Sequence, residues 1–104
     1  MLNNSSNISA NKFTDCTNNE KVLSKNIPVD IIPVNTSRAY ACLINNSTAE
    51  ITLILGNSSD GAINKGIILK PGGSYEINAN NQYLGKVSAI ASSNSKLSYV
   101  ECSY

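Results

Sequence analysis

The chain contains no histidine and no tryptophan, and only 14% of its residues are charged. Without histidine it cannot build a Ser-His-Asp triad, a Cys-His nucleophile pair or a histidine metal site. Its seven carboxylates are scattered over different predicted strands and turns, so no two have the spacing of a glycosidase pair or a calcium loop. We therefore expect a protein that is not an enzyme and that uses no metal or cofactor.

Charge is not only scarce but nearly balanced. Eight basic residues stand against seven acidic ones, and the lysines are dispersed singly along the chain. No basic stripe that could follow a phosphate backbone is present, so nucleic acid is not an expected partner. Asn, Ser and Thr instead fill about a third of the chain, which gives a polar surface without charge. Such a surface suits contact with other proteins.

Long apolar segments are also missing. No stretch approaches the roughly 20 consecutive apolar residues that a membrane-spanning helix requires. The first eight residues, Met-Leu-Asn-Asn-Ser-Ser-Asn-Ile, have neither the basic start nor the apolar centre of a secretory signal. We expect no membrane contact, and synthesis in the cytoplasm without Sec export.

The three cysteines, Cys16, Cys42 and Cys102, are too few for a disulfide framework and form no Cys-x-x-Cys pair. We expect free thiols, with Cys42 and Cys102 acting as small apolar residues of predicted strands. One alternative stays open. Cys42 and Cys102 could form a disulfide if the fold brings their Cα atoms within about 7 Å.

What the chain has in abundance is β-strand sequence. Seven or eight short apolar or alternating segments are separated by turn residues, and no segment has the 3.6-residue apolar period of a helix. This spacing predicts an all-β fold, an antiparallel two-sheet β-sandwich over residues 21–104, and a jelly-roll arrangement is compatible with it. Residues 1–20 have no such pattern and are expected to form an extended N-terminal arm outside the core.

Local signals refine this prediction. Pro71-Gly72-Gly73 separates two apolar runs, so Gly66–Ile77 is predicted to be a β-hairpin. Pro28 and Pro33 flank a strand-like segment and predict that it lies at a sheet edge or a bend, because proline cannot donate to a β-ladder. Residues 39–44 are short and wholly apolar, which predicts a central strand buried on both faces.

Arg38 precedes the predicted central strand and has two interpretations. It is either a solvated flanking residue with a surface ion pair, or a guanidinium that binds loop carbonyls where the strand begins. The second interpretation is slightly favoured.

Candidate contact residues lie in the arm and on the strands. Ile8 and Phe13 are candidate anchors of the arm on a neighbouring molecule, although a floppy terminus fits the same sequence. Tyr40 and Tyr83 are candidate interface residues, because tyrosine offers a large contact area at low entropic cost. Stacking of these tyrosines on carbohydrate is the less favoured alternative.

Several segments follow one another in an order that resembles a known class of proteins. They are Ser-Arg-Ala-Tyr-Ala-Cys-Leu-Ile-Asn-Asn-Ser at 37–47, Glu-Ile-Thr-Leu-Ile-Leu-Gly at 50–56, Gly66–Ile77, Gly-Lys-Val-Ser-Ala-Ile-Ala-Ser-Ser at 85–93 and the strand at 97–101. Over residues 22–102 the chain is similar to small virion proteins of tailed bacteriophages. Cys42 and Cys102 depart from that pattern, since these positions are usually apolar.

The resemblance implies a structural role and no catalytic residues. It implies a β-sandwich made in the host cytoplasm that decorates or cements the virion capsid, binds the major capsid protein and often forms a trimer. A receptor-binding or carbohydrate-binding module of a phage tail fibre is the alternative expectation.

Overall fold

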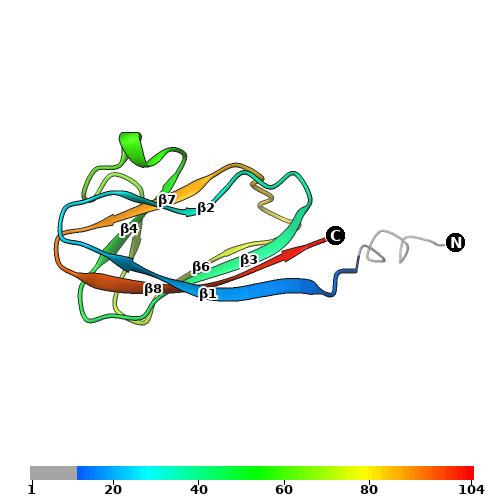
Figure 1. Ribbon diagram of the computed structural model, residues 1–104, viewed down its shortest axis with the longest axis horizontal. Helices are drawn as coiled ribbons and strands as arrows, with labels where there is room; N and C mark the ends of the chain where they lie inside the picture. The colour runs from blue at the N-terminus through cyan, green and yellow to red at the C-terminus, as the bar shows by residue number, and fades with distance from the viewer. Residues whose placement is uncertain (1–11) are drawn as a thin grey trace, which may run out of the picture.

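The computed structural model describes residues 12–104, which form eight β-strands and one short 3₁₀ helix (Figure 1). The elements are β1 (Asp15–Leu23), β2 (Val29–Ile32), β3 (Arg38–Asn45), β4 (Ile51–Leu55), η2 (Ser58–Asp60), β5 (Ile67–Leu69), β6 (Ser74–Ile77), β7 (Val87–Ala91) and β8 (Ser95–Ser103). They build two four-stranded antiparallel sheets in the orders β1-β8-β3-β6 and β2-β7-β4-β5. The predicted two-sheet antiparallel β-sandwich is therefore confirmed.

The strand order is that of a jelly roll. β1 pairs with β8, β2 with β7, β3 with β6 and β4 with β5, so the first half of the chain runs antiparallel to the second half. When this ribbon is rolled up, β3 meets β8 and β4 meets β7, which completes the two sheets. One consequence is that the first and last strands lie side by side at a sheet edge (Figure 1).

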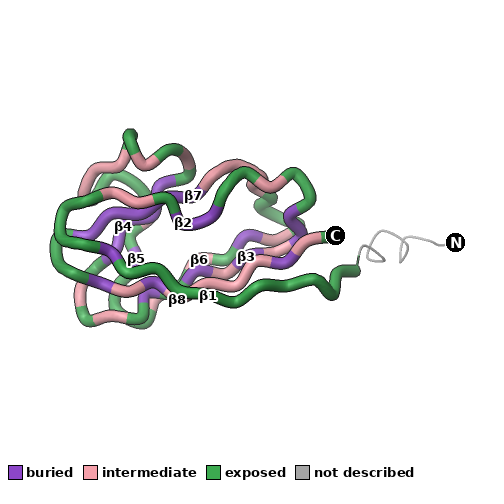
Figure 2. Tube along the Cα trace, viewed as in Figure 1, coloured by how far each residue is buried: buried purple, intermediate pink, exposed green. Residues whose placement is uncertain are grey.

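The hydrophobic core lies between the two sheets and takes alternate residues of the strands, as the two-residue period of β-structure requires, except in β2, where the bulge lets Ile31 and Ile32 both face inward. One sheet contributes Leu23, Ala41, Leu43, Ile77 and Leu97, and the other contributes Ile31, Ile32, Ile51, Leu53, Leu69, Val87, Ala89 and Ala91. Figure 2 shows buried backbone in the central strands and an exposed β1. Only Leu23 of β1 is buried.

The segment Gly66–Ile77 is not the predicted β-hairpin. β5 pairs with β4 and β6 pairs with β3, so the two arms belong to different sheets. The turn itself is present: the Gly73 amide donates to the Lys70 carbonyl at 2.7 Å, and Gly72 has a φ of 79°. The local turn signal was right, but the more distant strands β3 and β4 decide the pairing.

The edge strand was predicted correctly, and the central strand only in part. β2 is the edge of its sheet and carries a bulge between Asp30 and Ile32. β3 lies inside its sheet, but Tyr40 and Cys42 on its outer face are half-buried and Ile44 is exposed. The prediction that residues 39–44 are buried on both faces is wrong, because no layer among residues 12–104 covers this sheet from outside.

β1 begins at Asp15, within the segment that was expected to be an arm. It pairs with β8 in unbroken register from Asp15 opposite Ser103 to Leu23 opposite Ser95. The run Thr-Asn-Asn at 17–19 has no apolar alternation, so nothing local indicated a strand there. The expected boundary at residue 20 therefore falls inside β1, and residues 15–20 belong to the sheet.

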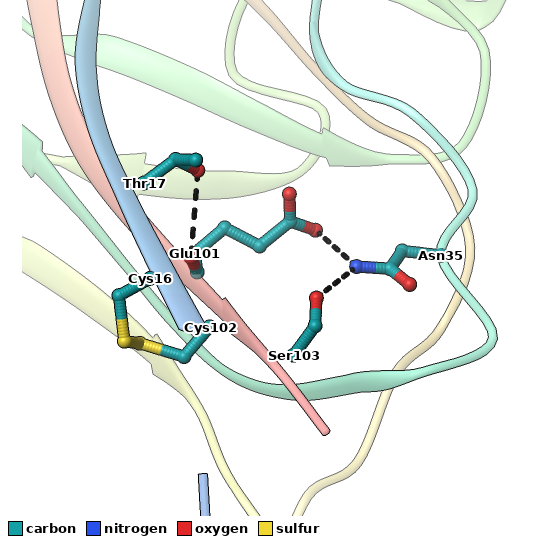
Figure 3. The surroundings of a disulfide bond; sticks show 6 residues. All are labelled: Cys16, Thr17, Asn35, Glu101, Cys102 and Ser103. Atoms are coloured by element: carbon teal, nitrogen blue, oxygen red, sulfur yellow. Dashed lines mark hydrogen bonds between the residues drawn. A yellow bond between two sulfur atoms is a disulfide. The ribbon is translucent and has the colours of Figure 1, made fainter. Parts of the chain in front are cut away.

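A disulfide joins Cys16 of β1 to Cys102 of β8 (Figure 3). The two residues are opposite in the register and their Cα atoms lie 4.0 Å apart. Cys42 is free. The expectation of three free thiols is wrong, as is the alternative bridge between Cys42 and Cys102. Because no strand was predicted at residue 16, Cys16 could not be placed opposite Cys102.

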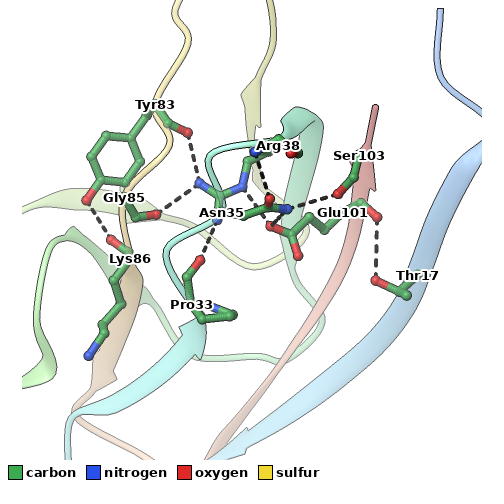
Figure 4. Close-up of polar contacts among 10 residues, drawn as sticks. Thr17, Pro33, Asn35, Arg38, Tyr83, Gly85, Lys86, Glu101 and Ser103 are labelled. Carbon is green, nitrogen blue, oxygen red and sulfur yellow. Dashed lines mark hydrogen bonds and ion pairs between the residues drawn. The ribbon is translucent and has the colours of Figure 1, made fainter.

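Arg38 is buried and connects the two sheets at one end of the sandwich (Figure 4). Its Nε donates to Glu101 Oε2 at 2.7 Å and its Nη2 to the Pro33 carbonyl at 2.7 Å. Its Nη1 donates to the carbonyls of Tyr83 and Gly85 at 2.8 and 2.9 Å. The second interpretation, a guanidinium that binds loop carbonyls, is confirmed, with an ion pair to Glu101 in addition.

Candidate interaction site

The outer face of the β1-β8-β3-β6 sheet presents apolar side chains that the core does not use. Because side chains alternate along a strand, the outward residues of β3 are Tyr40, Cys42 and Ile44. In the register with β8 they lie opposite Cys102, Val100 and Ser98. Two adjoining features result, an aromatic cluster and a surface hollow.

The aromatic cluster consists of Phe13, Tyr40 and Tyr104. The ring of Phe13 stacks on that of Tyr40, with centroids 6.2 Å apart and planes 10° apart. Tyr104 meets Phe13 edge to face at 6.3 Å. Aromatic pairs of this kind contribute about 0.5–1.5 kcal/mol beyond the area they bury. The cluster therefore holds the residues before β1 against the residues after β8.

The hollow lies next to the cluster and has a volume of about 370 Å³. Cys42, Ile44 and Val100 supply apolar lining, and Asn18, Asn19, Tyr40, Ser98 and Tyr99 line the rest of it. Binding sites commonly combine an apolar surface with a few polar groups that fix the orientation of the ligand. This hollow can take an apolar side chain of a partner and offer hydrogen bonds around it.

The polar tip of Tyr40 is fixed by Glu76 of the neighbouring strand β6. The Tyr40 hydroxyl donates to Glu76 Oε2 at 2.6 Å, and Asn78 donates to the other carboxylate oxygen at 2.9 Å. These bonds, the one from Tyr40 first, lower the pKa of Glu76. The bond to Glu76, and then burial, raise the pKa of Tyr40. Tyr40 is thus a neutral, oriented group at ordinary pH.

We expect Tyr40→Phe to raise the pKa of Glu76, because the carboxylate loses its strongest hydrogen-bond donor. The stabilisation from Glu76 exists above its ordinary pKa of 4.5 and is lost as the pH falls through the lowered value. The stabilisation from Tyr40 exists below its ordinary pKa of 10.0 and is lost as the pH rises through the raised value. The stability difference between wild type and Tyr40→Phe should therefore be greatest between the two ordinary pKa values, from pH 4.5 to pH 10.0.

Urea unfolding from pH 3 to pH 11 measures this difference, and the carboxyl ¹³C shift of Glu76 reports its pKa directly. Tyr75→Phe is the matched control, because Tyr75 faces the core side of β6. An unchanged Glu76 pKa in Tyr40→Phe would contradict the assignment.

The structure brings together two of the four predicted interface residues. Phe13 and Tyr40 are in contact. Tyr83 lies elsewhere: its hydroxyl donates to the Lys86 carbonyl at 2.6 Å and its ring packs against the core beside the Arg38 network (Figure 4). Ile8 lies outside the described residues.

Other residues of the site were not singled out from the sequence. Cys42 and Val100 share the outer face with Tyr40, and alternation along β3 and β8 is the signal that could have found them. No local signal points to Tyr104.

Two further properties of the described residues bear on binding. Within residues 12–104, no three side chains of His, Cys, Asp or Glu gather where they could hold a metal ion. The same part of the chain contains no helix with the length and apolar character to cross a membrane.

Comparison with known proteins adds nothing to this description of the site. No protein-family model, curated protein or solved structure matches the chain.

Proposed function

We propose that this protein is a structural virion protein that decorates the head of a tailed phage. In this proposal it binds the major capsid protein through the outer face of the β1-β8-β3-β6 sheet. The observation that carries the proposal is the contiguous apolar surface of Tyr40, Cys42, Ile44 and Val100, which lines a hollow on a sheet face that no other layer among residues 12–104 covers. An apolar surface rimmed by polar residues is typical of protein–protein contact sites.

The fold and the disulfide support this proposal without requiring it. Jelly rolls recur in viral capsid proteins, although they also occur in lectins, so the fold alone does not choose a function. Disulfides persist on virion and cell surfaces and are rare in the cytosol. A protein made in the host cytoplasm and displayed on a particle would close the Cys16–Cys102 bond once it leaves the reducing compartment.

The test compares two isoleucines of nearly equal exposure on opposite faces. Ile44, in the hollow, is 41% exposed, and Ile68, on the outer side of β5, is 42% exposed. We expect Ile44→Lys to weaken binding to undecorated heads by about 30-fold or more, as the loss of an interface hot spot does. Ile68→Lys should bind as the wild type does. Co-sedimentation of purified protein with heads measures both.

Equal binding by both variants would contradict the proposed contact face. Copy number tests the broader assignment, because a decoration protein is present in hundreds of copies per particle and a tail protein in a handful. Quantitative mass spectrometry of purified particles separates the two.

A second candidate is a carbohydrate-binding module of a tail fibre. It is favoured by the amides of Asn18 and Asn19 beside the ring of Tyr40, since sugars are bound by hydrogen-bonding groups next to an aromatic face. In that case Asn18→Ala would abolish glycan binding, and head binding would be absent in the wild type.

A further inference from the structure

The two sheets have four edge strands, and three of them carry features that prevent further pairing. β2 lies between Pro28 and Pro33 and contains a bulge. β5 has three residues and β6 has four, so both are short. β1 differs: it has nine residues, its first eight are exposed, and it contains no proline and no bulge in its pairing with β8.

The register identifies which backbone groups of β1 face the open edge. The Asn46 amide donates to the Lys96 carbonyl at 3.0 Å, so even-numbered residues of β8 bond to β3 and odd-numbered ones bond to β1. The 4.0 Å Cα separation of Cys16 and Cys102 agrees, since it is that of a non-hydrogen-bonded pair. The backbone amides and carbonyls of four β1 residues therefore point away from β8, toward the open edge of the sheet. These residues are Cys16, Asn18, Glu20 and Val22.

We propose that β1 pairs with β1 of a second copy of this chain, antiparallel and around a two-fold axis. The two β1-β8-β3-β6 sheets then become one continuous sheet. A two-fold axis perpendicular to the sheet can only pair residues that share a face. With the axis at Asn18, Asp15 lies opposite Lys21 of the second copy, and the symmetry repeats this pair. Opposite charges that face each other across strands are stabilising.

Neighbouring registers lack this complementarity. With the axis at Thr17, Asp15 lies opposite Asn19, and with the axis at Asn19, it lies opposite Leu23. Lys21 then faces Phe13 or Thr17, and in neither case do opposite charges meet. With the axis at Asn18, the edge-facing backbone groups of Cys16, Asn18 and Glu20 also meet those of the second copy. The Glu20 amide, which donates to Asn19 Oδ1 at 2.8 Å in the single chain, exchanges that partner for the Cys16 carbonyl of the second copy.

This register also accounts for the inward-facing charge on β1. Lys21 shares the face of β1 that carries buried Leu23, and an inward-facing charge on an edge strand normally discourages pairing. Asp15 of the second copy neutralises that charge only in the proposed register. The arrangement is closed, because the outer edges of the joined sheet are the short β6 strands, so pairing stops at two molecules.

The pairing goes beyond the proposed capsid function and differs from the trimer that the resemblance implied. It places the two hollows on one surface, where a lattice partner would engage both at once and gain avidity. Its test does not depend on capsid binding. Light scattering of the full chain after size exclusion should give twice the chain mass of 11.1 kDa.

Charge exchange then tests the register. In Asp15→Lys, two lysines face each other, and in Lys21→Glu, two acidic residues do, so we expect each variant alone to be monomeric. An equimolar mixture should form a dimer, because every facing pair in the heterodimer is then opposite in charge. The double variant D15K/K21E should also dimerise. Lys65→Glu, in a loop away from β1, is the control and should behave as the wild type.

Hydrogen exchange separates β1 pairing from any other dimer. The amides of Cys16 and Asn18 should exchange more slowly as the concentration rises, whereas those of Thr17 and Asn19, already bonded to β8, should not change. A monomeric or trimeric wild type would overturn the proposal. So would a dimer that both single variants retain, or one that leaves the Asn18 amide unprotected.

Discussion

Arg38→Met should lower the free energy of unfolding by about 3–5 kcal/mol, the usual cost of removing one partner from a buried ion pair. The Arg38 side chain is fully buried and that of Glu101 is 14% exposed. The substitution would therefore leave the Glu101 carboxylate without its cation and largely shielded from water. The carbonyls of Pro33, Tyr83 and Gly85 would lose their donors in the same step. Urea unfolding followed by tyrosine fluorescence measures the change.

Two other variants make this prediction specific. Lys70→Met removes a cation from the exposed pair with Glu50, and it should cost no more than about 1 kcal/mol. Arg38→Lys keeps the charge but cannot reach four acceptors, so its stability should lie between those of wild type and Arg38→Met. If Arg38→Met does not fold, Arg38→Lys still tests whether the several donors of the planar guanidinium are needed. Equal stabilities of Arg38→Met and Lys70→Met would contradict the network.

Removal of the Cys16–Cys102 disulfide should cost about 2–5 kcal/mol. The bond spans a sequence separation of 86 residues, and closing so long a loop restricts the unfolded chain strongly. β1 also depends on it locally, because its only buried residue is Leu23 at the far end of the strand. Without the bond, we expect the start of β1 to separate from β8 before the core unfolds.

The variant C16A/C102A tests this without leaving a thiol that could pair with Cys42. Urea unfolding gives the change in stability, and hydrogen exchange at Thr17 and Asn19 should accelerate before exchange in β3. Cys42→Ser is the matched control and should retain wild-type stability, because Cys42 is free. Peptide mapping of the unreduced wild type must show Cys16 linked to Cys102, and a Cys42–Cys102 link would contradict the structure.

The fold class could be predicted because its signals are local. Alternation along residues such as Tyr75 and Ile77, turn residues between runs, and the prolines around β2 all act within a few positions. The pairing could not be predicted in this way. Whether the chain after Pro71-Gly72-Gly73 returns to β5 or crosses to β3 depends on strands many residues distant. β1 could not be predicted for the same reason, because its partner β8 is the last strand and lies many residues away in the sequence.

The candidate site was predictable to a similar extent. Phe13 and Tyr40 were chosen for their chemistry, and the contact between them arises only because β1 runs beside β8 and β8 beside β3. Tyr83 has the same chemistry, but its hydroxyl donates to the Lys86 carbonyl and its half-buried ring packs against the core. Residue type therefore indicated candidates, and long-range pairing decided which of them share a surface.

The disulfide has a further consequence for resistance to proteolysis. Because it links the first strand, β1, to the last strand, β8, the sandwich between them is a covalently closed ring. A protease that cuts an exposed loop, such as the one around η2, opens this ring without releasing a fragment. The two new ends stay attached to the same molecule, and the sheets on either side remain paired. Two separate cuts would be needed before any strand between Cys16 and Cys102 could leave.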